Sequence, residues 1–175
     1  MTDWSQIVEQ HGPAVWRTAI RLLSNEADAA DCFQRTFLSA LEVSRKEVVR
    51  NWPALLKRLV TARAIEQLRQ RRQGTERLST LSPVTADRKA INPAEAAMAG
   101  ELADRLREAL AEIDPQQARV LCLACLEGHS YQEIADQLGM TVSSVGVLVN
   151  RGRLALRERL RPTAPAAEHF GETQR

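Results

Sequence analysis

The 175-residue chain is long enough for one medium-sized domain or two small ones. An apolar content of 44% fits a globular protein with buried cores, and only seven aromatic residues leave those cores to leucine, valine, isoleucine and alanine. The net charge of +2 hides alternating blocks: residues 45–77 carry +7 and residues 141–161 carry +4, whereas residues 1–44 and 78–140 carry −3 and −5. Two basic blocks predict two contacts with a polyanion on one chain, although solvated helix faces would give the same pattern.

The sequence contains no apolar run long enough to span a membrane, and its start lacks the features of a signal peptide. We therefore expect a cytoplasmic protein without membrane insertion. Three cysteines, an odd number, argue against a disulfide framework.

The first 72 residues show only helical periodicity, which favours an all-α fold. Asp3 is expected to cap a short helix that ends at Gly12-Pro13, and a second helix follows over residues 15–23. Asn25 and Asn51 are expected to cap two more helices, and the arginines of the last one lie largely off its apolar stripe.

A segment rich in Gly, Ser, Thr and Pro without periodicity follows, and it predicts a flexible linker. We place two small helical domains at residues 1–73 and 93–161, the linker at 74–92, and a disordered tail at 162–175. Asn92 and Asp114, each followed by a proline, predict two further helix starts.

The second domain contains the spacing of a helix-turn-helix. Ser130 and Glu133 form a capping box, Gly139 suits a left-handed turn, and Thr141 caps the next helix. In that helix we expect the following residues to face inward: Val142, Val145, Val149, Gly152 and Leu156.

The outward residues of this last helix are expected to enter the major groove of DNA. Serine and asparagine can bond to base edges, Val147 can contact a thymine methyl group, and arginines suit phosphates. The predicted DNA-binding residues of this helix are Thr141, Ser143, Ser144, Val147, Asn150, Arg151 and Arg153.

The pair Cys122-x-x-Cys125, with His129 nearby, suggests a metal or redox site. A zinc site needs four ligands, and the pair lies in the apolar run VLCLACLEG, where cysteine acts as a small hydrophobe. No nucleophile motif or phosphate-binding glycine loop accompanies it. We therefore expect no metal, no cofactor and no enzymatic activity.

Two stretches of the chain resemble the bacterial sigma factors of the extracytoplasmic-function group. DAADCFQRTFLSAL (28–41) with WPALLKRLVTARAIEQLRQRR (52–72) resembles region 2 of that family, and residues 106–160 resemble its region 4, notably LEGHSYQEIA and NRGRLALRERL. The resemblance covers most of the chain and implies a protein that directs core RNA polymerase to promoters.

The resemblance also implies which residues do what. Region 2 would bind the clamp coiled coil of polymerase through Asp31, Gln34, Arg35, Thr36 and Phe37. It would bind and help to melt the −10 promoter element through Arg45, Lys46, Arg50, Asn51, Trp52, Arg58, Arg63, Gln67 and Arg69. Region 4 would bind the −35 element and the polymerase flap, and an anti-sigma factor would control the protein.

Several positions depart from the family pattern. Arg35 replaces a usual acidic residue, Ala62 and Glu66 stand where asparagine and aspartate are frequent, and Gly146 and Leu148 replace common basic residues. Trp52 suits either a platform for unstacked bases or a place in the core.

Two alternative functions remain open at this point. One is a helix-turn-helix regulator with a helical dimerisation or sensing domain, and the other is a sigma-like protein that binds polymerase without contacting DNA bases.

Overall fold

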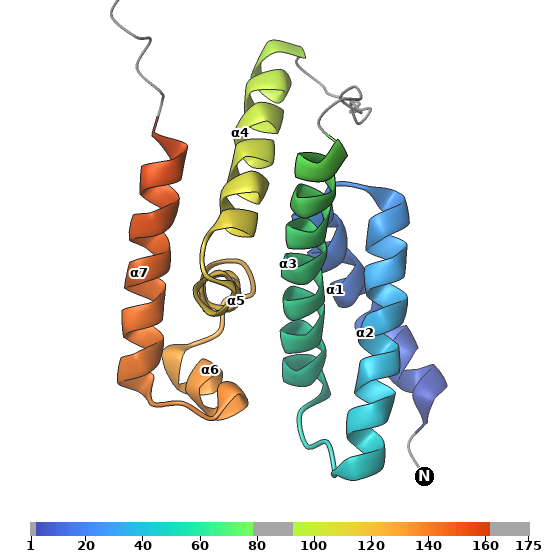
Figure 1. Ribbon diagram of the computed structural model, residues 1–175. Coiled ribbons are helices and arrows are strands. Elements are labelled where there is room, and N and C mark those ends of the chain that lie inside the picture. The colour runs from blue at the N-terminus through green and yellow to red at the C-terminus, as the bar shows by residue number, and fades with distance from the viewer. Residues whose placement is uncertain (1–2, 79–92, 162–175) are drawn as a thin grey trace, which may run out of the picture.

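The computed structural model describes residues 3–78 and 93–161, and these ranges form seven α-helices (Figure 1). The helices are α1 (Trp4–Leu23), α2 (Glu26–Lys46), α3 (Trp52–Leu78), α4 (Pro93–Glu112), α5 (Pro115–Cys125), α6 (Tyr131–Leu138) and α7 (Val142–Leu160). The described residues contain no strand, so the expected all-α class is confirmed. None of the described helices is long and apolar enough to cross a membrane.

Helix α3 continues to Leu78, beyond the expected end of the first domain at residue 73. Most of the expected linker, the Asn92 cap and the tail at 162–175 lie outside the described residues. The other predicted caps are confirmed: side-chain oxygens of Asp3, Asn25, Asn51 and Asp114 accept bonds from backbone N–H groups two or three residues later.

The expected break at Gly12-Pro13 is wrong, because α1 runs through both residues. Proline removes one helix hydrogen bond at a cost of about 3 kcal/mol. Apolar residues on both sides of it, including Ile7 and Val15, are buried in one core, and each contributes roughly 1.5–3 kcal/mol. Gly12 is itself buried, and a Cβ there would lie 3.6 Å from the Phe33 ring. Tertiary packing therefore outweighs the local breaker.

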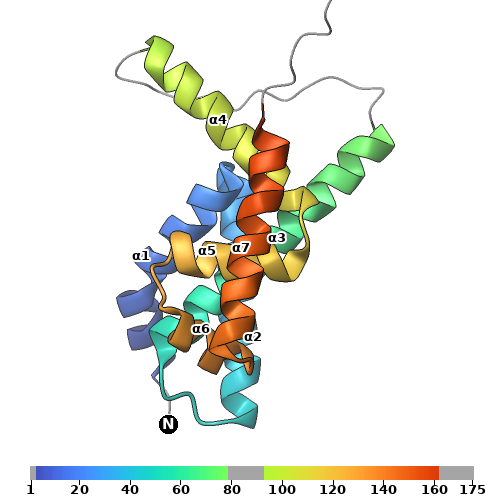
Figure 2. The same ribbon diagram turned by 90° about the vertical axis from the view of Figure 1, so that its left-hand side faces the viewer.

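Helices α1, α2 and α3 pack against one another, and α4 to α7 form a second group. The two groups lie side by side, with α5 between α7 and α3 (Figures 1 and 2). They share an apolar core: Leu110, Ile113 and Cys122 of the second group belong to the same buried cluster as Leu56 and Ile65 of α3. The described structure is therefore a closed arrangement of the two halves.

The loop after α5 provides a polar contact between the halves. Glu127, whose side chain is 7% exposed, accepts a hydrogen bond from the Thr18 hydroxyl at 2.7 Å. Lys57 Nζ donates to the Glu127 carbonyl at 3.1 Å and lies 3.7 Å from its carboxylate. Arg21 donates to the Leu126 carbonyl at 3.3 Å. Charged groups of α1 and α3 thus hold this loop in place.

Two arginines bind helix ends across the same interface. Arg69 of α3 donates to the carbonyls of Ala111 and Ile113, at 3.3 and 3.0 Å. Arg107 of α4 donates to the carbonyls of Leu22 and Arg21 at the end of α1, at 3.0 and 3.1 Å. Carbonyls at a helix C-terminus lack partners within the helix and favour a cation, so both contacts stabilise the closed arrangement.

His129, in the same loop, should make stability depend on pH. Its side chain is 9% exposed, and among the described residues its Nε2 is buried without a partner. Burial, and then Lys57, lower its pKa below 6.5 despite the opposing carboxylates of Glu133 and Glu127. The folded state then binds fewer protons than the unfolded state near pH 6, so stability falls on acidification below about pH 6.5.

We expect the thermal unfolding midpoint to drop between pH 7 and pH 5, and His129→Gln to reduce that drop. Unfolding scans of both proteins at several pH values would check this. An equal change of the unfolding midpoint with pH in the two proteins would contradict a role for His129.

Gly152 marks the close crossing of α7 and α5, as the sequence pattern indicates. A Cβ at this position would lie 3.4 Å from the Gln117 carbonyl oxygen and 3.6 Å from the Leu121 side chain. Gly152→Ala should be nearly neutral, because a gain of about 1 kcal/mol in helix propensity offsets the tight contact. Gly152→Leu should destabilise by about 2 kcal/mol or more through overpacking. Denaturant unfolding of the two variants measures this difference in stability. Equal free energies of unfolding would contradict the prediction.

Candidate nucleic-acid interface

The helix-turn-helix forms as the sequence predicts. Ser130 N donates to a carboxylate oxygen of Glu133 at 2.8 Å, and Glu133 N donates to the Ser130 hydroxyl at 3.2 Å. The bonds that the Ser130 backbone N–H and hydroxyl donate to this carboxylate lower the Glu133 pKa. Gly139 takes the left-handed conformation, with φ at +63°, and Thr141 caps α7 by accepting from Ser144 N at 3.1 Å. Both ends of the turn are thus fixed by local bonds.

A small core holds α7 against α6. Ile134, Val145 and Val149 are 0% exposed and pack with Ala135. Val142 is 41% exposed, so its expected inward position is wrong. It occupies the first turn of α7, immediately after the chain leaves the α6–α7 turn, where the core does not reach it.

The two unusual residues in the middle of α7 have structural explanations. Gly146 faces the ring of Tyr131, and a Cβ there would lie 3.8 Å from that ring. A lysine at this position would have to pass the ring. Leu148 is half-buried and packs against the core of the second group. In the middle of α7, Val145, Leu148 and Val149 are therefore used for packing, whereas Val147 is exposed.

The outer side of α7 presents an exposed row. Val147 is 45% exposed, and the other exposed members of the row are Ser143, Ser144, Asn150 and Arg151. The Thr141 hydroxyl is exposed but is used in the cap, and it also lies 2.8 Å from the Ser144 hydroxyl.

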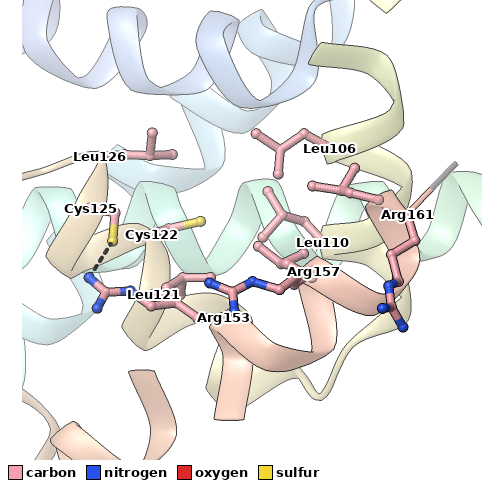
Figure 3. Close-up of a pocket in the computed structure, with 11 residues that line it drawn as sticks. Leu106, Leu110, Leu121, Cys122, Cys125, Leu126, Arg153, Arg157 and Arg161 are labelled. Atoms are coloured by element: carbon pink, nitrogen blue, oxygen red, sulfur yellow. Dashed lines mark hydrogen bonds between the residues drawn. The ribbon is translucent and has the colours of Figure 1, made fainter. Parts of the chain in front are cut away.

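Arg153 points elsewhere, since its Nη2 lies 3.7 Å from Cys125 Sγ of α5. It lines a groove of about 600 Å³ between α4, α5 and α7 (Figure 3). Cys122, at the bottom of this groove, is buried, and burial raises its pKa to about 12, whereas Cys125 is exposed. No group of metal-ligating side chains occurs among the described residues.

The end of α2 and the loop after it carry three exposed basic residues, Arg45, Lys46 and Arg50. The Asn51 side chain caps α3 by accepting from Ala54 N at 3.0 Å. Trp52 packs against the core and meets Trp4 edge-on, with ring centroids 5.3 Å apart. Of the two expected roles for Trp52, this contact favours the place in the core.

Some of the predicted DNA-binding residues on α3 are accessible to solvent, and others are bound to neighbouring helices. Arg63 is exposed and donates to the Ser39 hydroxyl, and Arg58 is half-buried. Gln67 donates to Asp31 at 3.5 Å, while Arg69 is engaged by the end of α4. Sequence reasoning missed the engagement of Arg69, because its partners lie more than 40 residues away.

The outer side of α2 carries most of the residues expected to bind polymerase. Arg35 and Asp31 form an ion pair at 2.9 Å, so the unusual arginine neutralises a neighbouring acid of its own helix. Gln34 is exposed, and Phe37 packs on Phe33.

Thr36 is wrong as a contact residue. It is 0% exposed, and its hydroxyl donates to the Cys32 carbonyl. Its β-branched side chain fills the core and satisfies its polar group within α2. Leu38, an apolar residue on the same helix, is 60% exposed.

Two family models match the chain: Sigma-70 region 2 over residues 7–74, and Sigma-70 region 4 over residues 103–156. ECF RNA polymerase sigma factor SigE of Mycolicibacterium smegmatis is 31% identical over 99% of this chain, which spans only 65% of that protein. ECF RNA polymerase sigma factor SigW of Bacillus subtilis is 26% identical, with 90% of this chain and 89% of that protein covered.

A solved structure also has a similar fold. It is the sigma factor RpoE in complex with the anti-sigma factor NepR from Bartonella quintana, with a TM-score of 0.57 and 22% sequence identity. The match covers 94% of this chain and all of the other chain. At this identity the likeness supports the fold alone.

Proposed function

The chain belongs to the sigma-70 family of RNA polymerase sigma factors, in the extracytoplasmic-function group, and we propose from this that it directs core polymerase to specific promoters. The observation that carries the proposal is the combination, on one chain, of a helix-turn-helix with a second basic surface at the end of α2. Such a factor acts in the cytoplasm by binding, so we assign it no catalytic residue, metal or cofactor. Run-off transcription with core polymerase on promoters from the source genome tests the proposal. Failure to bind core polymerase and to initiate at any of them would overturn it.

We propose a division of labour between residues 1–73 and residues 93–161. The outer row of α7 (Ser143, Ser144, Val147, Asn150 and Arg151) contacts the −35 element. The exposed basic residues Arg45, Lys46, Arg50 and Arg63 contact the −10 element and hold melted strands by their phosphates. Arg69 joins that surface only if the contact with α4 opens.

Two substitutions on α7 separate phosphate binding from base recognition. Arg151→Ala should weaken binding to all DNA sequences and reduce the salt slope by about one, because one phosphate contact is lost. Ser144→Ala should change preference at one or two base pairs, at a cost of roughly 1–3 kcal/mol for the preferred base. Titrations at several salt concentrations against −35 variants measure both. Unchanged −35 dependence in both variants would mean that α7 does not make the specific contact.

The polymerase contacts are proposed on two surfaces. The exposed outer side of α2 (Asp31, Gln34, Arg35 and Leu38) suits the clamp coiled coil. The groove between α4, α5 and α7 suits an apolar helix such as the tip of the flap, because its floor is leucine-rich. Each surface lies on one half of the molecule.

We propose that the closed arrangement does not engage both DNA elements at once. Elements named for positions −35 and −10 are roughly 85 Å apart at 3.4 Å per base pair, whereas the 19-residue α7 is only about 28 Å long. We propose that the two halves separate when the protein binds polymerase, which also releases Arg69. Because RpoE of Bartonella quintana forms a complex with an anti-sigma factor, we further propose that a partner of this class holds the inactive state.

A further inference from the structure

The groove between α4, α5 and α7 has the features of a small-molecule site. Its volume of about 600 Å³ falls in the range of sites that enclose small ligands. The floor is apolar and comes from three helices. Leu106 and Leu110 of α4 and Leu121 of α5 line it (Figure 3). Leu156 and Leu160 of α7 also line it.

One wall of the groove is cationic. Arg153, Arg157 and Arg161 follow one another at intervals of four residues, over about 12 Å of helix length. No carboxylate lines the groove, and none of the three arginines forms an ion pair within residues 3–78 and 93–161. Figure 3 shows these guanidinium groups along the α7 side of the leucine floor.

We propose that this groove binds a long-chain fatty acid, with the alkyl chain on the leucine floor and the carboxylate against Arg157 and its neighbours. Guanidinium groups bind carboxylates through paired hydrogen bonds, which matches the head group. A single alkyl chain suits the floor, because the leucine side chains offer no polar partner and the arginines can pair only with the head group. The proposal rests on the proposed function in one respect: the bound acid would exclude the polymerase helix assigned to this groove.

Cys125 offers a direct measure of occupancy. It is exposed and lines the groove, whereas Cys32 and Cys122 are buried. An alkylating reagent should therefore modify Cys125 first, and a molecule in the groove should slow that reaction.

The experiment follows alkylation of Cys125 by mass spectrometry in the full chain, with dodecanoate below the concentration at which it forms micelles. We expect dodecanoate to slow alkylation several-fold. Tetradecanoate, with two more methylenes, should act at a roughly fifteenfold lower concentration, because each buried methylene tightens binding about fourfold. Dodecanol and dodecyltrimethylammonium should protect at least fivefold less. The double variant Arg157→Gln, Arg161→Gln should lose the preference for dodecanoate over dodecanol. Arg17→Gln, which removes one arginine charge on an exposed α1 residue away from the groove, should keep it.

Absence of protection by dodecanoate, or equal protection by the alcohol and the cationic amphiphile, would overturn the proposal. If core polymerase protects Cys125 and dodecanoate does not, the proposal also fails, and the polymerase helix is the occupant of the groove. These outcomes are independent of the transcription assay, so the fatty-acid proposal can fail while the protein still initiates transcription. If the acid binds, added dodecanoate should reduce the affinity for core polymerase in the parent and not in the double variant.

Discussion

Glu127→Lys should separate the two halves of the molecule. The substitution places a second cation beside Lys57 in a site where the native side chain is 7% exposed. It also removes the 2.7 Å acceptor of the Thr18 hydroxyl, whose other acceptor is the Ala14 carbonyl at 3.2 Å. Lys57 is itself a third exposed, so solvent screens part of the effect. We expect the closed state to lose about 1–3 kcal/mol. Glu127→Gln, which keeps an acceptor for Thr18, should have a smaller effect.

Small-angle X-ray scattering should show the opening. A compact chain of this length has a radius of gyration of roughly 16 Å, and separation of the halves should raise the measured value by a few ångströms. If opening precedes polymerase binding, the apparent Kd for core polymerase should also fall about three- to tenfold, because less free energy is spent on opening.

Glu101→Lys is the matched control, since Glu101 is exposed on α4 and its replacement makes the same charge change. It should leave both scattering and polymerase affinity unchanged. A Glu127→Lys protein that scatters like the parent would show that the apolar contacts alone hold the closed state. An open protein with unchanged polymerase affinity would contradict the link between opening and binding.

Features fixed by local bonds could be predicted from the sequence. The caps at Asn25, Asp114 and Thr141 involve partners two or three residues away, and Gly139 takes the left-handed conformation that its position in the pattern requires. The helix-turn-helix followed from such signals, whereas the family resemblance rested on the motifs in residues 28–41, 52–72 and 106–160.

Features that depend on distant contacts could not be predicted. The continuity of α1 through Pro13 depends on packing with other helices, and the engagement of Arg69 depends on the end of α4. The family resemblance placed Thr36 at the polymerase contact, but a buried threonine can satisfy its hydroxyl within its own helix. Periodicity placed Val142 inward, but a valine at a helix end can lie beyond the core. The tertiary structure was therefore needed to separate the candidate site residues that are exposed from those that are buried or bound to other helices.

Leu38→Asp should strongly weaken binding to polymerase while leaving the fold intact. Leu38 is 60% exposed and lies one turn after Gln34 on α2, beside the ion pair of Asp31 and Arg35. Burying a leucine at an interface contributes roughly 1.5–3 kcal/mol, so its loss should weaken core binding by at least tenfold. An aspartate adds the cost of burying a charge.

Val8→Asp tests whether this effect is specific to the α2 surface. Val8 is a partly exposed apolar residue of α1, at 38%, and the substitution introduces the same charge. Core binding should change less than twofold in this variant. Both proteins should unfold within a few degrees of the parent, because neither side chain lies in the core. Equal loss of core binding in the two variants would indicate a general effect of added negative charge, and an unaffected Leu38→Asp protein would place the polymerase contact on another surface.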